Sequence, residues 1–361
     1  MSEQPLQGAK HHWTIHDVAR LGGVSAKTVS RVVNNEPGVG QATRARIRAI
    51  IHEVGYHPHM GARSMRSAPR DCVGVTVSAP MEEVRIRLEI FDWIFAQLYE
   101  IFGTRGTYLC FDLNPHEAGE HIDYARGLWE QRYGGCIIVG PLRKGDLVLR
   151  RVHESGHPYL VLNRPEDLPE CSHACVDYEE AAYISTQFLV KRGHTRIAML
   201  QGFSKFQGGI ERLRGYARAL DDAGLPFDHG LVAPTSFATR EITHAVHRLL
   251  LDPAVSALID GSCAEDAKGI REGARRAGRA PGKDLDVVAW TYTDNAAVLS
   301  EACAHVWLPL IEAANAGFAQ LADWFYGVRT TPVRIVYRPT LYEAVAASEM
   351  PPPRRLFEVL S

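Results

Sequence analysis

The sequence predicts a multidomain protein: a small all-α head, then an α/β region of two doubly wound parallel-sheet subdomains. Near the N-terminus, apolar residues recur at helical spacing on both sides of a glycine pair. After residue 71, short apolar runs alternate with helical segments, which is typical of parallel strands covered by helices on both faces. This alternation restarts near residue 176. A chain of 361 residues is long enough for these separate cores.

The stretch 14–34 is predicted to form two short helices joined by a tight turn. Thr14 can cap the first helix, and Asp17 lies three residues later, where a capping box has its acid. The pair Gly22-Gly23 breaks this helix where the backbone must turn sharply. Ser25 can cap the second helix. The apolar side of the second helix consists of Val29, Val32 and Val33.

The opposite side of the second helix carries small residues and cations. These are Ala26, Lys27, Ser30 and Arg31. Such a surface, held against another helix, fits the major groove of DNA. A third helix over 41–54 should close a three-helix core, with Ile47 in its apolar stripe. We expect Arg44 or its neighbours near phosphates, where contacts position a protein without reading sequence.

This stretch resembles the DNA-binding helix-turn-helix head of the lactose-repressor (LacI) family of bacterial transcription regulators. The shared motifs are Thr14-Ile15-x-Asp17-Val18-Ala19, Gly23-Val24-Ser25, Thr28-Val29-Ser30-Arg31-Val32, Asn34, Thr43-Arg44 and Gly55-Tyr56-x-Pro58. Fixed residues at fixed spacing over about sixty positions make this pattern far more specific than one short motif. The resemblance implies a DNA-binding set that comprises Thr14, Ser25, Ala26, Lys27, Thr28, Ser30, Arg31, Asn34, Arg44 and Tyr56.

Residues 58–70 follow this head, assigned to 13–57, and are rich in Arg and small residues. Alone they would pass for a linker. The resemblance implies a hinge helix that orders on the operator and inserts an apolar side chain into the minor groove. Here Met65 takes the position where Leu is usual, following Ala62 and Arg63.

The distribution of charge supports contact with DNA through one end only. Residues 1–70 contain ten Lys and Arg against four Asp and Glu, a net charge of +6, whereas the rest of the chain has a net charge of −8. A basic end on an acidic body suits a protein that touches polyphosphate with one part. A basic surface without a partner is the alternative, which the head motifs disfavour.

The span 71–345 resembles the effector domain of the same family, which shares its fold with periplasmic sugar-binding proteins. Its predicted strands are 73–77, 107–111, 136–140, 159–163, 196–200, 257–259 and 287–290. The local matches are Lys191-Arg192-Gly193-His194-x-Arg196-Ile197-Ala198, Glu211-Arg212-Leu213-Arg214-Gly215-Tyr216 and Val306-x-x-Pro309. The resemblance implies that the chain crosses back between subdomains. The expected N-subdomain is about 71–175 with 305–333, and the C-subdomain is about 176–304 with 334–345.

The resemblance also implies an effector in the cleft between these subdomains. Arg212 matches a position where relatives bind effector, and Phe237 matches one where an aromatic ring often stacks on it. For Phe237 an ordinary core position is an equally good interpretation. The full predicted effector set is Arg85, Arg87, Asn163, Arg212, Phe237, Cys263 and Thr291.

Two positions depart from the pattern of sugar-responsive relatives. Cys263-Ala264 replaces an Asn-Asp pair, and Thr291 replaces an acid. Because carboxylates usually accept hydrogen bonds from sugar hydroxyls, these losses argue against a plain neutral hexose. We therefore expect an effector with negative or apolar character, such as a sugar acid, sugar phosphate or aromatic glycoside. Asp260 and Asp266 remain alternative acceptors.

Other classes of protein lack support in the sequence. The seven Cys are odd in number and unpaired in spacing, which favours reduced thiols in the cytoplasm. We find neither a secretory signal nor an apolar run near the ~20 residues of a membrane span. Phosphate-loop, dinucleotide and nucleophile-elbow motifs are absent, so we expect no enzyme and no cofactor. Cys171-x-His173-x-Cys175 is a weak metal candidate, because a zinc site usually needs a fourth ligand.

The sequence therefore predicts a cytoplasmic homodimeric repressor of carbohydrate-related genes, which binds double-stranded operator DNA with twofold symmetry. A corepressor-dependent repressor, an activator and a solute-binding protein remain alternatives. The tail 1–12 is predicted to be loose, and the tail 346–361 is predicted to be either loose or packed down.

Overall fold

The computed structural model describes residues 13–33, 36–54, 56, 71–78, 88–112, 117–118, 121–140, 142–202, 206–235, 238–263, 267–292 and 300–343. The chain divides into two compact units, Met1–Pro69 and Arg70–Ser361. The two tails and the predicted hinge lie outside the described residues. So do seven predicted site residues: Asn34, Ala62, Arg63, Met65, Arg85, Arg87 and Phe237.

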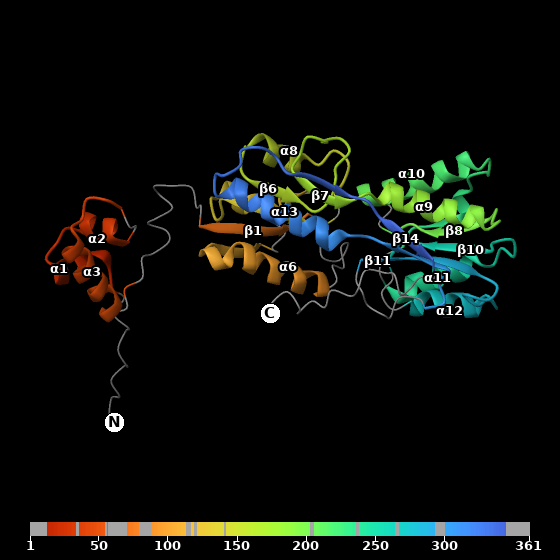
Figure 1. Ribbon diagram of the computed structural model, residues 1–361, viewed down its shortest axis with the longest axis horizontal. Helices are drawn as coiled ribbons and strands as arrows, with labels where there is room; N and C mark the ends of the chain where they lie inside the picture. The colour runs from red at the N-terminus through yellow and green to blue at the C-terminus, as the bar shows by residue number, and fades with distance from the viewer. Residues whose placement is uncertain are drawn as a thin grey trace, which may run out of the picture. The chain divides into compact units, whose positions relative to one another are not determined.

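The first unit contains the helices α1 (Ile15–Gly22), α2 (Ala26–Val33) and α3 (Gln41–Val54) (Figure 1). The predicted capping box is present at the start of α1. The backbone N–H of Asp17 donates to Thr14 Oγ1 at 3.3 Å, and that of Thr14 donates to Asp17 Oδ2 at 3.0 Å. Gly23 ends α1 in the left-handed conformation, with φ 59°, which glycine adopts without strain.

The three helices enclose one small apolar core. Its buried members are Val18, Ala19, Val29, Val32, Ile47 and Tyr56. Gly22 allows α1 to approach α3 closely, since an added Cβ would lie 2.2 Å from Cδ1 of Ile47. The predicted three-helix head is therefore confirmed, with the two helices of the motif packed against the third.

The first sheet of the second unit has the strand order β13-β7-β6-β5-β1-β2, and all its strands are parallel. The strands are β1 (Cys72–Val77), β2 (Tyr108–Asp112), β5 (Gly135–Val139), β6 (Tyr159–Val161), β7 (His173–Val176) and β13 (Arg334–Tyr337). The helices α6 (Leu88–Ile101) and α13 (Leu310–Phe325) pack on one face, and α7 (Arg126–Trp129) and α8 (Leu147–Glu154) on the other. The short segments are η1 (Gly103–Arg105), β3 (Glu117–Ala118) and β4 (His121–Ile122).

The second sheet has the order β14-β12-β11-β10-β8-β9, with β14 antiparallel to its neighbour. Its strands are β8 (Ile197–Leu200), β9 (Val232–Ala233), β10 (Ala257–Asp260), β11 (Asp286–Thr291), β12 (Ala304–Trp307) and β14 (Thr340–Glu343). The helices α9 (Tyr178–Lys191) and α10 (Gln207–Asp222) cover one face, and α11 (Thr239–Leu249) and α12 (Lys268–Arg276) cover the other (Figure 1). The single-turn segment η2 (His229–Leu231) precedes β9.

Alternate residues of each central strand enter opposite cores. In β8, Ile197 and Met199 face the core under α9 and α10, whereas Ala198 and Leu200 face the core under α11 and α12. Burial on both faces explains why these strands appear in the sequence as continuous apolar runs. The predicted fold class, two doubly wound parallel-sheet subdomains after an all-α head, is confirmed.

The crossings between the subdomains lie later in the chain than predicted. Residues 305–333 were expected in the N-subdomain, but Ala304–Trp307 pairs with β11 of the second sheet. Residues 334–345 were expected in the C-subdomain, but Arg334–Tyr337 pairs with β7 of the first sheet. Hydrogen bonding to a distant strand, which no local apolar pattern reveals, decides which sheet receives each of these two strands. The crossings therefore follow Trp307 and Tyr337.

Candidate nucleic-acid interface and effector site

The outer face of α2 is a candidate surface for reading base edges. Val29 and Val32 point into the head core, so the opposite side of this helix remains available. Lys27 is exposed there, and Ala26, Ser30 and Arg31 are partly exposed. Helices of this kind enter the major groove with such side chains, while the partner helix lies across the backbone.

Other predicted DNA residues have structural contacts in the head. The hydroxyl of Ser25 accepts a hydrogen bond from the backbone N–H of Thr28 at 3.1 Å, which caps α2. The Arg44 guanidinium donates to the carbonyl of Glu36 at 2.5 Å, linking α3 to the loop after α2. Tyr56 was expected at the DNA, but it is 6% exposed and lies in the head core. These residues position the recognition helix whether or not they touch DNA.

The carboxyl ends of the two sheets face each other in the second unit. Each sheet reverses its strand order there, since β1 lies between β2 and β5, and β8 lies between β9 and β10. Ligands of doubly wound folds bind beyond the carboxyl ends of strands at such a reversal. The Leu142 carbonyl, after β5, accepts from the backbone N–H of Gln207, at the start of α10, at 3.0 Å. Loops after the strands of the first sheet therefore touch the element that follows β8.

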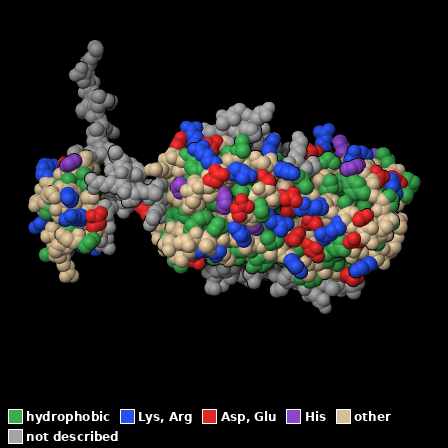
Figure 2. Space-filling model, turned by 90° about the horizontal axis from the view of Figure 1, so that it is seen from above, with side chains coloured by type: hydrophobic (Ala, Val, Ile, Leu, Met, Phe, Trp, Pro, Cys, Tyr) green, Lys and Arg blue, Asp and Glu red, His purple; other side chains and the backbone are tan. Residues whose placement is uncertain are grey.

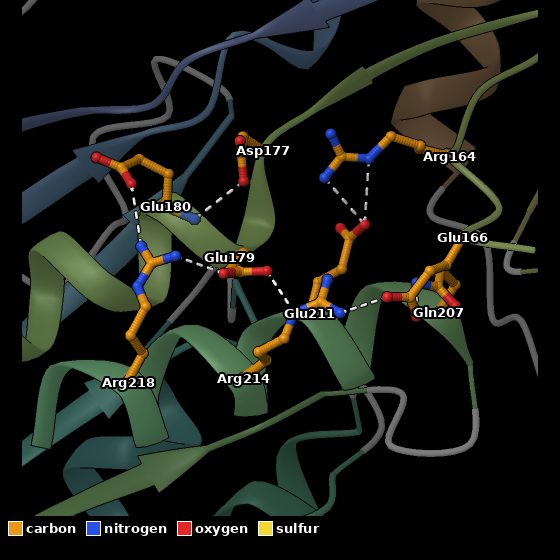
Figure 3. A network of polar contacts seen from close by, with 9 residues as sticks. All are labelled: Arg164, Glu166, Asp177, Glu179, Glu180, Gln207, Glu211, Arg214 and Arg218. Atoms are coloured by element: carbon orange, nitrogen blue, oxygen red, sulfur yellow. Dashed lines mark hydrogen bonds and ion pairs between the residues drawn. The ribbon is translucent and has the colours of Figure 1, made fainter. Parts of the chain in front are cut away.

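Charged side chains bridge this subdomain junction (Figure 3). Arg164, which follows β6, pairs with Glu211 on α10 through Nη2 and Oε1 at 3.2 Å. Glu166 pairs with Arg214 on the same helix at 2.5 Å, and it accepts from Gln207 at 3.4 Å. These contacts attach two loop residues of the first subdomain to one helix of the second.

The environments of the two junction carboxylates differ. Burial raises the pKa of the Glu211 carboxyl, an effect that the Arg164 guanidinium partly offsets. Hydrogen bonding from Arg214, and then from Gln207, lowers the pKa of Glu166, which lies near solvent. Of the two carboxylates, Glu211 therefore has the larger desolvation penalty when charged, because folding removes its carboxylate from water.

Arg212 lies beside this network at the carboxyl edge of the second sheet. It is 7% exposed, and its Cζ lies 4.2 Å from the ring centroid of Tyr178 and 5.7 Å from that of Trp290. An added Cβ on Gly261, which follows β10, would lie 3.7 Å from Cδ of Arg212. The side chain thus lies at the ends of β10 and β11, close to the strand-order reversal.

The structure brings several predicted effector residues to the same two edges. Cys263 is buried just after β10, with φ 54°, and Thr291 is the buried last residue of β11. Asn163 lies on the opposing subdomain after β6, and its Oδ1 accepts from the backbone N–H of Arg164 at 2.8 Å. Arg212 shares the edge of Cys263 and Thr291, whereas Asn163 belongs to the other sheet.

Sequence reasoning missed four residues of this site: Arg164, Tyr178, Glu211 and Trp290. For three of them the available signal was position, because Arg164 follows a predicted strand, Trp290 ends one, and Glu211 lies within the Glu211–Tyr216 motif, whereas nothing local singled out Tyr178. The indole N–H of Trp290 donates to Ser185 at 2.9 Å, which holds the ring in place under Arg212.

The candidate metal residues belong to the apolar interior. Burial raises the pKa of both Cys171 and Cys175 to about 12, so these thiols stay protonated near neutral pH. Burial lowers the pKa of His173, whose Nδ1 lies 3.0 Å from the Cys171 carbonyl. Within the described ranges no group of three His, Cys, Asp or Glu is arranged to hold a metal ion.

Large apolar side chains are exposed on α6 and the neighbouring edge strand β2. Phe95, Tyr99 and Phe111 lie on the α6 side of the sheet, and we call them the aromatic face, whereas the exposed Tyr108 alternates to the side of Cys110. The rings of Phe95 and Phe111 have centroids 6.0 Å apart, so helix and strand contribute to one surface. In contrast, Figure 2 shows acidic and basic side chains interspersed over the side of the α/β unit turned to the viewer. An exposed aromatic cluster of this kind usually marks a protein interface.

Two family models match the chain. Residues 14–59 match the model of bacterial regulatory proteins of the lacI family, and residues 108–316 match that of periplasmic binding proteins and the sugar binding domain of the LacI family. The HTH-type transcriptional regulator CelR of Thermobifida fusca is 31% identical over 90% of this chain and 95% of its own. The maltose regulon regulatory protein MalI of Escherichia coli is 30% identical, over 75% of this chain and 77% of its own.

Solved structures show the same architecture. A CelR–cellobiose complex has a TM-score of 0.64 and 27% identity, covering 91% of this chain and 98% of its own. A lac repressor dimer bound to operator and an anti-inducer has a TM-score of 0.72 and 20% identity, covering 92% of this chain and 98% of its own. Fold and site together define a DNA-binding transcription regulator with an α/β ligand-binding domain. The chain belongs to the lacI family of bacterial regulatory proteins.

Proposed function

We propose that this protein is a homodimeric repressor of carbohydrate-related genes, which binds a palindromic operator and is controlled by a small molecule between its α/β subdomains. The observation that carries this proposal is the combination, in one chain, of a helix-turn-helix head and two sheets that meet at their carboxyl ends. The head supplies contact with a half-site, and the sheets supply a place for an effector. Both tasks are binding, so we propose no enzymatic activity.

The aromatic face supports the dimer. Phe95 is 54% exposed, and its neighbours on α6 and β2 would be shielded from water by a second copy of the chain. A twofold axis through such a surface places two heads on two half-sites, which requires an operator with matching symmetry. A lac repressor of similar fold is described as a dimer bound to operator.

The names of two relatives support a general class of effector. One is described as a complex with cellobiose, and another as the regulator of a maltose regulon. We propose a carbohydrate-related effector for this chain, and action in the cytoplasm, where a bacterial operator is located. No helix of the described residues is long and apolar enough to cross a membrane.

Control by the effector requires different affinities for two arrangements of the subdomains. The ion pairs from Arg164 and Glu166 to α10 exist only when the loops after β6 lie against this helix. A ligand at the neighbouring carboxyl ends can favour or oppose that contact. The predicted hinge would pass the resulting change to the heads.

Selection of bound duplexes from a random pool tests the proposal. The wild-type chain should recover a twofold-symmetric site. Arg31→Ala should relax base preference at one position of each half-site and weaken binding by about 1–3 kcal/mol. Arg46→Ala, exposed on α3, is the matched control and should leave base preference unchanged. Recovery of no symmetric site would contradict the proposed dimeric repressor, and an unchanged preference in Arg31→Ala would remove that residue from base recognition.

A further inference from the structure

The most unusual group of the second unit is the guanidinium of Arg212. It is more than nine-tenths buried, with only 7% of the residue exposed. Its Nε is buried without a hydrogen-bond partner, and among the described residues it forms no ion pair. Its contacts are instead the faces of Tyr178 and Trp290. A buried cation is stable only when something neutralises it, and aromatic faces supply only part of that stabilisation.

The neighbouring cations of the junction are neutralised by the protein itself. The Glu211 carboxylate, adjacent in sequence to Arg212, turns to Arg164 at 3.2 Å. Arg214 pairs with Glu166 and with Glu179 (Figure 3). Glu211, Glu166 and Glu179 therefore pair with other arginines, and no carboxylate of the described residues lies within ion-pair distance of Arg212.

The strand ends next to Arg212 do not replace these acids. Cys263 and Thr291 supply a thiol and a hydroxyl where acceptors with charge would be expected. Asp260, at the end of β10, uses Oδ1 to accept from the backbone N–H and the hydroxyl of Ser262, at 3.1 and 2.5 Å. A neutral ligand that covered this site would bury the Arg212 guanidinium without an ion-pair partner among the described residues, which is unfavourable.

We infer that the effector of this protein is an anion, whose carboxylate or phosphate group pairs with Arg212. Tyr178 lies against one face of the guanidinium plane, and Trp290 also lies within cation–π distance. Because Nε is buried, we expect the ligand at the edge formed by Nη1 and Nη2, and an arginine edge of this kind matches two oxyanion oxygens at once. This inference rests on the proposed function, because it names the class of effector for the same site.

The test uses the full-length chain and matched pairs of probes in calorimetry and thermal denaturation. The anions are gluconate, glucuronate, glucose 6-phosphate and inorganic phosphate, and the neutral probes are glucose and cellobiose. At least one organic anion should bind about tenfold or more tightly than its neutral counterpart. Comparing the affinities of the carboxylate probes with those of the phosphate probes shows which oxyanion the site binds.

Two variants assign the effect to Arg212. Arg212→Gln keeps a planar hydrogen-bonding group without charge and should lower anion affinity about tenfold or more, while Arg212→Lys should retain part of it. Arg218→Gln changes a half-exposed arginine of the same helix and should leave anion affinity unchanged. Circular dichroism establishes that each variant is folded.

Three results would overturn the inference. They are tighter binding of glucose or cellobiose than of every anion, anion binding that persists in Arg212→Gln, and absence of binding by all the anions. Operator binding is measured in the same samples with the selected duplex. Absence of specific DNA binding both without ligand and with every probe contradicts the proposed repressor, whereas specific DNA binding that responds only to a neutral sugar contradicts only the anionic effector.

Discussion

Breaking the ion pair between Arg164 and Glu211 should destabilise the protein by an amount that depends on how deeply the pair is buried. Glu211 is 2% exposed, and its Oε1 accepts from Nε and Nη2 of Arg164 at 3.4 and 3.2 Å. The substitution Arg164→Met keeps much of the apolar stem but leaves the buried carboxylate unpaired. Loss of one partner of a buried pair costs about 3–5 kcal/mol. Because the Arg164 side chain is 29% exposed and water can reach the gap, we expect about 2–3 kcal/mol of lost unfolding free energy.

A double-mutant cycle separates pairing from packing. Glu211→Gln removes the buried charge together with the pair and should cost only about 1 kcal/mol. Arg164→Met combined with Glu211→Gln should therefore be more stable than Arg164→Met alone. Urea denaturation of the four proteins, followed by circular dichroism, gives the coupling energy. Additive losses from the two single substitutions would refute the argument that an unpaired carboxylate dominates the cost.

The same pair predicts a pH dependence. The pKa of Glu211 is raised in the folded protein above its ordinary value of 4.5, mainly by burial. The folded state therefore binds this proton more readily, and the contribution of Glu211 to stability falls as pH rises from the unfolded pKa through the folded pKa. Arg164→Met should raise the folded pKa further. The loss of unfolding free energy in Arg164→Met, relative to the wild type, should therefore reach its full size at about pH 8 and be smaller near pH 5. An equal deficit at both values would contradict this assignment.

Two further predictions concern packing and assembly. Phe95→Asp in the aromatic face should weaken the dimer by about tenfold or more in sedimentation, whereas Leu147→Asp, exposed on α8, should not; dimers of unchanged strength would exclude this face. Gly215→Ala should destabilise the α/β unit by about 1–3 kcal/mol or more, since its Cβ would lie 2.0 Å from the Glu179 carbonyl oxygen. Gly208→Ala on the same helix meets only ordinary contacts at 3.4 Å and longer, and it should show little loss of melting temperature; equal losses would refute the steric argument.

Local chemistry explains which parts of the fold the sequence could predict. The capping box of Thr14 and Asp17 spans three residues, and the cap at Ser25 reaches Thr28, so both follow from adjacent residues. The central strands are buried on both faces, which makes them continuous apolar runs. The edge strand β13 is exposed at Arg334, Val336 and Tyr337 and lacks that signal. Its membership in the first sheet depends on pairing with β7, far away in sequence.

In the candidate site, too, features that depend on neighbouring residues could be predicted, whereas contacts between distant residues could not. Arg212 could be singled out because it lies within a motif of neighbouring residues. The partner of Glu211 is 47 residues away, and no local pattern indicates that it is Arg164 rather than another arginine. Tyr178 and Trp290 belong to different elements and meet at Arg212 only after the second sheet has formed. Tyr56 matched a motif, yet the motif did not reveal that its ring is buried.

The late crossings between the subdomains have a consequence for folding of the protein during its synthesis on the ribosome. The first sheet receives β13 (Arg334–Tyr337) and the second receives β14 (Thr340–Glu343), both from the last part of the described chain. Neither subdomain can be completed until residues 334–343 have left the exit tunnel, whereas the head is encoded before both subdomains and forms from neighbouring residues. During synthesis, a nascent chain can therefore expose a finished DNA-binding head before its regulatory half is folded. A message truncated before the codon for Arg334 would leave both sheets without an edge strand, and its product would be a target for proteolysis.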